Sequence, residues 1–415
     1  MPKGIGEIPS LRLEVLQNFV TKFQGPANLA LMNIFGQSDS PSDTIRWESQ
    51  EGGRGMAQLK APGAPTPKSA PEGMAEHSAK AAFWGDKRYF DEEFLNNLRK
   101  PGTESGYMEA SQTLANNLAT MIRRCERRKE WFFSKMFTSG SFTYERAQGV
   151  KATVNYAIPT THKVGLTTDY KWGTGTKANI LGDVMDCKGL IADDCGGQVD
   201  YMMFNRTVLR YIAANSSILD LLKKSNYGDG DLFKGNRNSI VGVNTNVLGS
   251  LLDIPNLIVY DELYEVKAFL TGAVTGSSTT VIPVSDAGDF VATGTLRFYD
   301  SSEGTWEEET ITSVQVEAGT VTVGTAPTAS FKAGEDYVTM KRKYIPDNMV
   351  VFFTSTVDGE KIAEFKRAPF GLDRHYGIKT DTKETWDPDG INLRVQDKGL
   401  PVLYHRDGLY ILTVE

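Results

Sequence analysis

One long stretch of the chain carries a helical pattern of apolar residues. Between residues 104 and 138 they recur at spacings of 4, 3, 4, 7 and 4: Leu114, Leu118, Met121, Cys125, Phe132 and Met136. This period predicts one amphipathic helix, closed by Gly140. Ile122 and Phe133 widen the apolar stripe, so we expect the helix to pack on a sheet or on another subunit.

A second pattern precedes this helix. Residues 46–86 are interrupted by many glycines and prolines: Gly52, Gly53, Gly55, Pro62, Gly63, Pro65, Pro67, Pro71 and Gly73. The segment predicts an extended arm that goes out and returns as a long two-stranded loop. Its backbone donors and acceptors need partners, and the flanking aromatics Trp47, Phe83 and Trp84 favour burial. We therefore expect the arm to lie on another copy of the chain.

The rest of the chain alternates between strands and helices. Residues 11–35 predict a short helix ended by Pro26. Helices are expected at 180–192 and 207–224, and buried strands at 200–205, 257–261 and 349–353, which together suggest a compact α/β-type domain. Residues 377–385 and 391–397 predict a strand pair, and 409–414 a buried last strand.

Residues 271–340 differ from their surroundings. They are rich in Thr, Val and Gly, with short alternating stretches that predict a small all-β insertion domain. The segment has ten acidic and two basic residues, a net charge of −8, and the whole chain has −7, so the remainder has +1. We therefore expect a separate, solvated unit, with the strands at 257–261 and 349–353 as neighbours on either side of it.

Composition limits the class of protein. The chain has 415 residues, enough for two or three domains and a sizeable core. It contains no run of eighteen apolar residues and no secretory signal at its start, so no membrane partner and synthesis in the cytoplasm are expected. The three cysteines, Cys125, Cys187 and Cys195, predict buried free thiols.

The sequence contains no residue pattern that requires catalytic chemistry. The four histidines, His77, His162, His375 and His405, are far apart and favour structural or surface roles. Residues 173–177 resemble a phosphate loop only superficially, and the acidic run 307–309 predicts a solvated strand surface. We expect no catalytic residue, no metal and no cofactor.

The basic run of the long helix allows two readings. Arg123, Arg124, Arg127, Arg128 and Lys129 form either a patch that faces nucleic acid or one side of salt bridges between subunits. The interleaved acids Glu126 and Glu130 favour the second reading. The net charge of −7 also argues against a general nucleic-acid binder.

In its order of parts the chain resembles the major capsid proteins of tailed bacteriophages with the Hong Kong 97-like fold, and most closely the lambda-type capsid family. Three segments carry the resemblance: the arm EGGRGMAQLKAPGAPTPKSAPEG followed by AAFWGDKRYFDEE, the helix end RRCERRKEWFFSKMFTSG, and the C-terminal GINLRVQDKGLPVLYHRDGLYILTVE. It covers the whole chain except 271–340. The implied fold class is α+β with an inserted small all-β domain.

The resemblance also implies a division of the chain. Residues 1–43 would be the N-terminal arm and 44–90 the E-loop. Residues 91–177 and 361–400 would form the P-domain with its spine helix at 104–138. The A-domain would comprise 178–270, 341–360 and 401–415, with 271–340 as the insertion. The expected contacts between subunits, from E-loop and spine helix, are Trp47, Arg54, Lys60, Pro65, Lys68, Phe83, Trp84, Arg123, Arg127 and Arg128.

The implied function is structural. The resemblance implies self-assembly into pentamers and hexamers of an icosahedral virion shell, formed in the host cytoplasm, that encloses double-stranded DNA without reading its sequence. A separate scaffolding protein and a portal would be partners, and a decoration protein is left open. One alternative is the shell of an encapsulin-type nanocompartment. Another is a carbohydrate-binding protein whose β module offers Trp306 and Phe298 as platforms.

Overall fold

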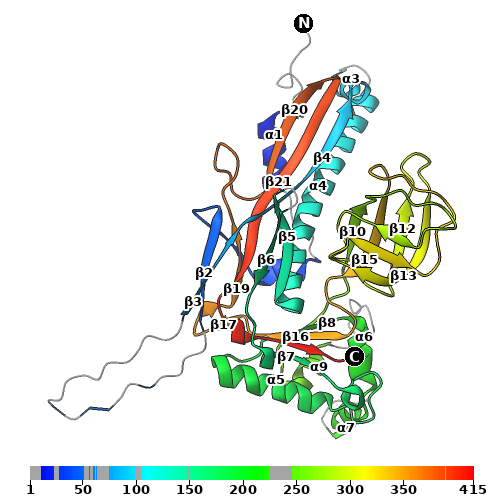
Figure 1. Cartoon of the computed structure of the whole chain (residues 1–415). Coiled ribbons are helices and arrows are strands. Elements are labelled where there is room, and N and C mark those ends of the chain that lie inside the picture. Colours follow the sequence, from blue (N-terminus) through cyan, green and yellow to red (C-terminus); the bar gives the residue numbers. More distant parts are fainter. Residues whose placement is uncertain are drawn as a thin grey trace. The chain divides into compact units, whose positions relative to one another are not determined.

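The computed structural model of the chain separates into two compact units (Figure 1). The first comprises Met1–Tyr260 and Ile345–Glu415, and the second is the segment Asp261–Tyr344. The structure describes residues 11–22, 28–50, 56, 59, 60, 62, 74–99, 104–147, 150–224, 245–387 and 389–415.

The predicted long helix is present as α4 (Glu104–Ser139), with 36 residues. At 1.5 Å per residue it is about 54 Å long. Gly140 follows it with φ of +72°, a left-handed conformation that glycine adopts without steric cost, so the helix ends where the sequence indicated. All six residues of the predicted stripe are buried, which confirms the period.

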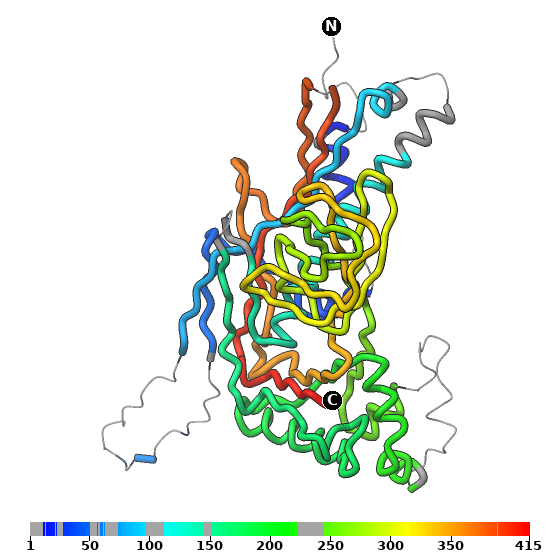
Figure 2. Tube along the Cα trace, turned by 45° about the vertical axis from the view of Figure 1, so that its right-hand side comes forward, coloured from blue at the N-terminus to red at the C-terminus, as the bar shows by residue number. Residues whose placement is uncertain are grey.

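A five-stranded sheet packs along α4 in the first unit (Figures 1 and 2). Its central strand is β21 (Asp389–Leu403), which pairs antiparallel with β20, β4 and β19. The predicted strand pair near the C-terminus is thereby confirmed. The remaining strands are β1 (Gln37–Asp39), β4 (Ala82–Asp91), β19 (Ala363–Arg367) and β20 (Lys379–Trp386).

The core between this sheet and α4 is apolar. Alternate residues of β21 enter it from the sheet (Ile391, Leu393 and Val395), and the α4 stripe meets them from the other side. Burial of such side chains stabilises by roughly 1.5–3 kcal/mol each, so this layer contributes strongly to the stability of the unit. The other helices near it are α1 (Leu13–Lys22), α2 (Ala30–Ile34) and α3 (Glu92–Arg99).

A second sheet of five strands has the order β7-β22-β16-β8-β9. Its strands are β7 (Lys163–Gly165), β8 (Tyr201–Phe204), β9 (Asn256–Val259), β16 (Met349–Phe353) and β22 (Leu409–Thr413). The helices of the same part of the chain are α5 (Ile180–Cys195), α6 (Arg206–Ala214), α7 (Ser216–Lys224) and α9 (Thr245–Leu252). The buried last strand, β22, is confirmed.

Two predictions for this region were wrong in detail. Strands β9 and β16 are not paired with each other, because β8 lies between them and pairs with both. The single helix expected at 207–224 is two helices. Asn215 has extended backbone, ends α6, and accepts hydrogen bonds from the first amides of α7 through its side chain, so it breaks the helical pattern.

Among the described residues, three two-stranded hairpins complete the first unit. The first joins β2 (Thr44–Gln50) to β3 (Met74–Lys80), with Thr44 opposite Lys80 and Gln50 opposite Met74. The predicted out-and-back arm is therefore present at its root, and most of its tip lies outside the described residues. The other two pair β5 (Ser141–Ala147) with β6 (Val150–Asn155), and β17 (Thr356–Val357) with β18 (Glu360–Lys361).

The second unit is all-β in its described elements. Its sheet has the order β10-β15-β12-β13-β14-β11 and encloses its own core, which includes Leu296, Phe298 and Val338. The strands are β10 (Leu263–Phe269), β11 (Val281–Pro283), β12 (Thr295–Tyr299), β13 (Trp306–Gln315), β14 (Thr320–Val323) and β15 (Tyr337–Lys343). The compact unit is wider than 271–340 because β10 pairs along its whole length with β15.

The three thiols are free and buried, as predicted. Burial raises the pKa of Cys125 to about 12 and also raises the pKa of Cys187. In the part of the chain that the structure describes, no helix combines the length and apolarity needed to cross a membrane.

Candidate assembly surface

The β2–β3 hairpin is held at its root by its own chain. The Trp47 indole stacks on His77, lies against Tyr156, and is only 5% exposed. An ion pair joins Lys80 to Asp43, and a weaker one joins Arg46 to Glu76. The prediction that Trp47 reaches a neighbouring copy is therefore corrected, because its ring belongs to the core of the subunit.

The other two aromatics that flank the arm differ in their surroundings. Trp84 packs edge-on against Phe132 and Phe365 and is partly buried, so its role between subunits stays a prediction. Phe83, the next residue on β4, points the other way and stays half exposed, with Phe370 and Lys398 beside its ring. Successive strand residues face opposite sides, which explains the difference.

The basic run of α4 is divided between interior and surface. Lys129 is buried, and its Nζ lies 2.7 Å from Asp397 Oδ2 and 3.1 Å from Glu126 Oε1. Burial alone would lower the pKa of Lys129, but the two carboxylates raise it above the ordinary value. Arg124 pairs with Asp86. Both cations therefore have an acidic partner within the subunit.

The other residues of the run lie on the surface. Arg123, Arg127 and Arg128 are exposed, and the Arg128 guanidinium lies over the Trp131 ring. Of the residues predicted for contacts from the arm, Lys60 is exposed, while Arg54, Pro65 and Lys68 lie outside the described residues. A role between subunits stays a prediction for this group.

Glu130 holds distant parts of the subunit together, and the sequence reading missed it. Its carboxylate accepts hydrogen bonds from the backbone amides of Leu31 (3.0 Å) and Met32 (2.9 Å) and from the Tyr260 hydroxyl (2.7 Å). Burial raises its pKa in spite of these donors. The amides belong to the first turn of α2, whose N-cap residue Leu29 supplies no side-chain hydrogen bond. A carboxylate from α4 thus caps α2.

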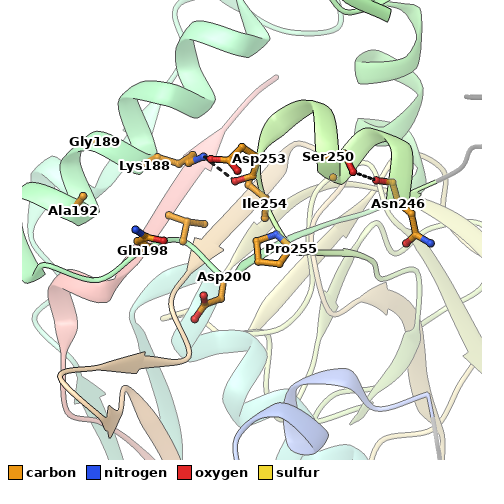
Figure 3. Close-up of a pocket in the computed structure, with 12 residues that line it drawn as sticks. Lys188, Gly189, Ala192, Gln198, Asp200, Asn246, Ser250, Asp253, Ile254 and Pro255 are labelled. Carbon is orange, nitrogen blue, oxygen red and sulfur yellow. Dashed lines mark hydrogen bonds and ion pairs between the residues drawn. The ribbon is translucent and has the colours of Figure 1, made fainter. Parts of the chain in front are cut away.

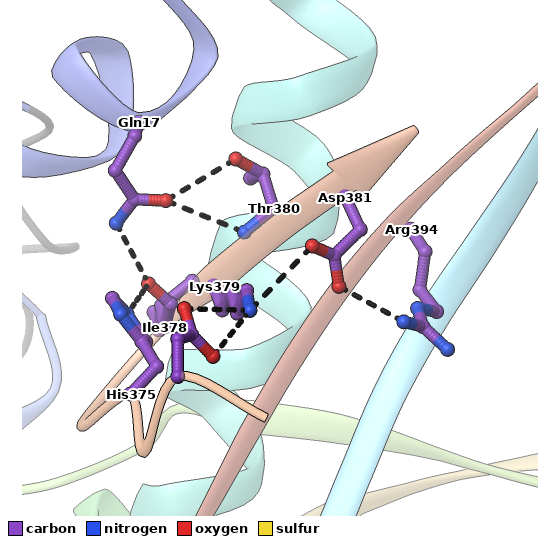
Figure 4. Close-up of polar contacts among 8 residues, drawn as sticks. Gln17, His375, Ile378, Lys379, Thr380, Asp381 and Arg394 are labelled. Atoms are coloured by element: carbon purple, nitrogen blue, oxygen red, sulfur yellow. Dashed lines mark hydrogen bonds and ion pairs between the residues drawn. The ribbon is translucent and has the colours of Figure 1, made fainter. Parts of the chain in front are cut away.

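A loop with an exposed leucine is braced by a chain of charges (Figure 4). The Lys379 ammonium contacts both oxygens of Asp373, at 2.7 and 2.9 Å, and Asp381 at 3.8 Å, and Asp381 also pairs with Arg394. Gln17 of α1 hydrogen-bonds to Ile378 and Thr380 of the same strand region. The brace fixes residues 371–377, where Leu372 is fully exposed.

A cleft with a volume of about 790 Å³ lies between α5 and α9 (Figure 3). The Lys188 ammonium on its wall lies 2.7 Å from the Asp253 carboxylate. Asp200 accepts hydrogen bonds from the backbone and hydroxyl of Ser355. These charged groups are therefore occupied in holding the wall.

The loop at 173–177 and the buried side chain of His162 both make contacts that hold the fold together. The Lys177 amide bonds to the Asp169 carbonyl and the Gly175 amide to the Lys171 carbonyl, so the loop closes on itself. His162 lies between the Leu409 carbonyl (2.9 Å) and Asp194 (2.8 Å) and joins strand to helix.

Comparison with known proteins agrees with the architecture. A crystal structure described as a prophage capsid protein from E. coli CFT073 is 12% identical, covers 97% of this chain and 99% of its own, and has a TM-score of 0.51. A phage-related protein from Bordetella bronchiseptica RB50 is 11% identical with 96% of each chain covered and a TM-score of 0.48. The capsid of Staphylococcus phage Andhra is 8% identical, with 95% and 86% coverage and a TM-score of 0.43. No curated protein matches the sequence.

The mixed α+β fold, in which a long helix backs a sheet, matches the fold of Hong Kong 97-like capsid proteins. The sequence profile described as "Phage major capsid protein E" matches residues 16–303. The chain belongs to that family. It is a phage major capsid protein that forms the head shell, has no enzymatic role, and resides in the virion capsid. The family match decides against the nanocompartment alternative.

Proposed function

We propose that the subunit assembles into pentamers and hexamers by laying its β2–β3 hairpin over a neighbouring copy. The observation that carries this proposal is that β2 and β3 pair only with each other among the described strands. An isolated two-stranded hairpin is marginally stable in water. Its root is fixed in the subunit by Trp47, so its outer half is free to gain stability from a partner.

We propose a division of the chain that follows the capsid fold. It differs at two places from the division that the resemblance implied. The E-loop is residues 44–80, because β4 is paired with β21 and belongs with α4 and its sheet in the P-domain. The A-domain is built around the β7-β22-β16-β8-β9 sheet, and the insertion extends from Asp261 to Tyr344. A separate scaffolding protein and a portal are proposed partners, and the shell encloses double-stranded DNA without sequence-specific contacts.

Amide hydrogen exchange tests the arm. In free subunits we expect the amides at the outer half of the hairpin, around Glu48 and Glu76, to exchange at least tenfold faster than those of β21. In assembled shells these amides should become protected, because the neighbour shields the hairpin. The amides at Leu393 and Val395 serve as an internal control that is protected in both states. Equal exchange of the hairpin amides before and after assembly would contradict the proposal.

We further propose that the insertion lies on the outer surface and strengthens contacts between neighbouring copies. It has thirteen acidic and six basic residues, a net charge of −7, which accounts for the whole net charge of the chain. Packaged DNA would repel it, so the inner wall is disfavoured. Its two ends join β9 and β16, and Val259 and Val350 both align with Phe204 of β8.

Replacing the insertion tests this role. Val259 and Val350 are separated by one strand, about 10 Å at the usual strand spacing, so a linker of a few Gly and Ser residues closes the gap. We expect the variant that lacks Asp261–Tyr344 to give a soluble subunit whose shells dissociate at lower denaturant concentration than the parent shells. Negative-stain microscopy and light scattering measure this. An insoluble subunit would place the segment in the core, and a density map that shows it inside the shell would contradict the outward position.

A further inference from the structure

One outer face of the Asp261–Tyr344 unit carries a continuous row of aromatic side chains. Phe269 is the register partner of Tyr337, Tyr337 of Tyr299, and Tyr299 of Trp306, across β10, β15, β12 and β13. Register partners point to the same face of a sheet, so the four rings form one ladder. The Tyr299 and Tyr337 rings stack with centroids 4.7 Å apart. Trp306 is 60% exposed and Phe269 is 47% exposed.

Cations cover the rings of this ladder. The Lys267 ammonium lies 3.5 Å from the centroid of the Tyr337 ring and 4.9 Å from that of Phe269. The Arg297 guanidinium lies 4.9 Å from the centroid of the Trp306 ring. Lys267 and Arg297 flank Thr339 in the next row of the same face. Phe298, the other expected platform, is fully buried, so the carbohydrate reading is not supported.

Positive and negative residues are unevenly distributed between this face and the rest of the unit. The outward positions of the four strands include four basic residues (Lys267, Arg297, Lys341 and Lys343) and two acidic ones (Glu265 and Glu308), a net charge of +2. The remainder of the unit contains eleven acidic and two basic residues, a net charge of −9. Tyr, Trp and Arg are the side chains that most often dominate protein–protein contacts, and charge complementarity selects the partner.

We propose that this aromatic and basic face docks on the acidic remainder of the same unit in a second copy of the chain. Contact between two copies of the face itself would bring positive charge against positive charge. The contact is therefore head-to-tail, and a head-to-tail contact that closes makes a ring of subunits. The inference rests on the proposed role of the unit between neighbouring copies and adds the face, its partner and the orientation.

Footprinting of Trp306 tests the contact in the full-length chain. Free subunits and shells cleared of every other protein are exposed to hydroxyl radicals, and oxidation of each tryptophan is measured by mass spectrometry. We expect Trp306 oxidation to fall at least fivefold in shells, while buried Trp47 stays unmodified in both samples. Unchanged oxidation of Trp306 in shells would overturn the proposal. Protection in virions but not in cleared shells would do the same, because it assigns the face to another partner.

Two matched charge variants test the orientation. Lys267→Glu reverses a charge on the face, and Lys332→Glu makes the same change on the acidic remainder, where Lys332 pairs only weakly with Glu335. We expect Lys267→Glu shells to dissociate at clearly lower denaturant concentration than parent shells. Lys332→Glu shells should be at least as stable as the parent, because the change adds negative charge to the surface that meets the basic face. Equal loss in both variants would refute the assigned face. If removal of the whole unit weakens shells while Trp306 stays fully oxidised, the proposed function holds and this inference fails.

Discussion

Replacing Lys129 with alanine should destabilise the free subunit by about 3–5 kcal/mol, the usual cost of leaving a buried charge without its partner. The Lys129 side chain is 3% exposed and that of Asp397 is 0% exposed. Without the ammonium, Asp397 keeps one hydrogen bond from the Lys398 amide and has lost its countercharge. Urea unfolding followed by circular dichroism measures the loss.

Two further variants give this prediction its controls. Arg127→Ala removes a cation from the exposed side of the same helix and should change the free energy of unfolding by less than about 1 kcal/mol. The double variant Lys129→Met with Asp397→Asn removes both charges and should recover at least half of the loss, because neither charge is then left unpaired. A Lys129→Ala subunit as stable as the Arg127→Ala subunit would contradict the burial described above.

Replacing Glu130 with alanine should cost about 3–5 kcal/mol. Three buried donors lose their acceptor, and each unsatisfied donor costs roughly 1–3 kcal/mol, reduced where water enters. The loss has a local signature, because the amides of Leu31 and Met32 should exchange with solvent much faster while the amides of β21 change little. Exchange at Leu31 and Met32 equal to that of the parent would contradict the capping role.

Glu130→Gln serves as the control and also tests the pH dependence. Burial raises the folded-state pKa of Glu130 above its ordinary value of 4.5, so the folded chain binds more protons than the unfolded chain in that range. The contribution of this group is therefore full below about pH 4.5 and falls as pH rises through the folded-state pKa. The Gln variant cannot titrate, so its stability relative to the parent should improve as the pH rises through that range.

Features governed by local periodicity could be predicted from the sequence. The span of α4, its end at Gly140 and the C-terminal strand pair follow from side-chain spacing and from the conformational freedom of glycine. Lys129 was assigned to the surface because it lies in a basic run. The spacing of the apolar stripe argued against this assignment. Position 129 lies four residues after Cys125 and three before Phe132, so it occupies the same buried side of the helix.

Features that depend on partners distant in sequence could not be predicted in this way. The cap of α2 comes from Glu130, 99 residues beyond Leu31, and no local pattern encodes such a distance. The order of strands in a sheet could not be predicted for the same reason. Strand β8 lies between β9 and β16, and no local sequence pattern indicates this order. The aromatic ladder of the second unit was missed because its four members are spread over 69 sequence positions, from Phe269 to Tyr337, and only register aligns them.

The buried thiols have a practical consequence for studies of the shell. Thiolates, and not thiols, react with maleimides and iodoacetamide, and burial raises the pKa of Cys125 to about 12 while also hiding its sulfur from the reagent. Cys187 and Cys195 are equally enclosed. The natural chain is therefore a low-background host for site-specific fluorophores. A single cysteine placed at an exposed position such as Leu372 would carry one dye per subunit across the whole particle.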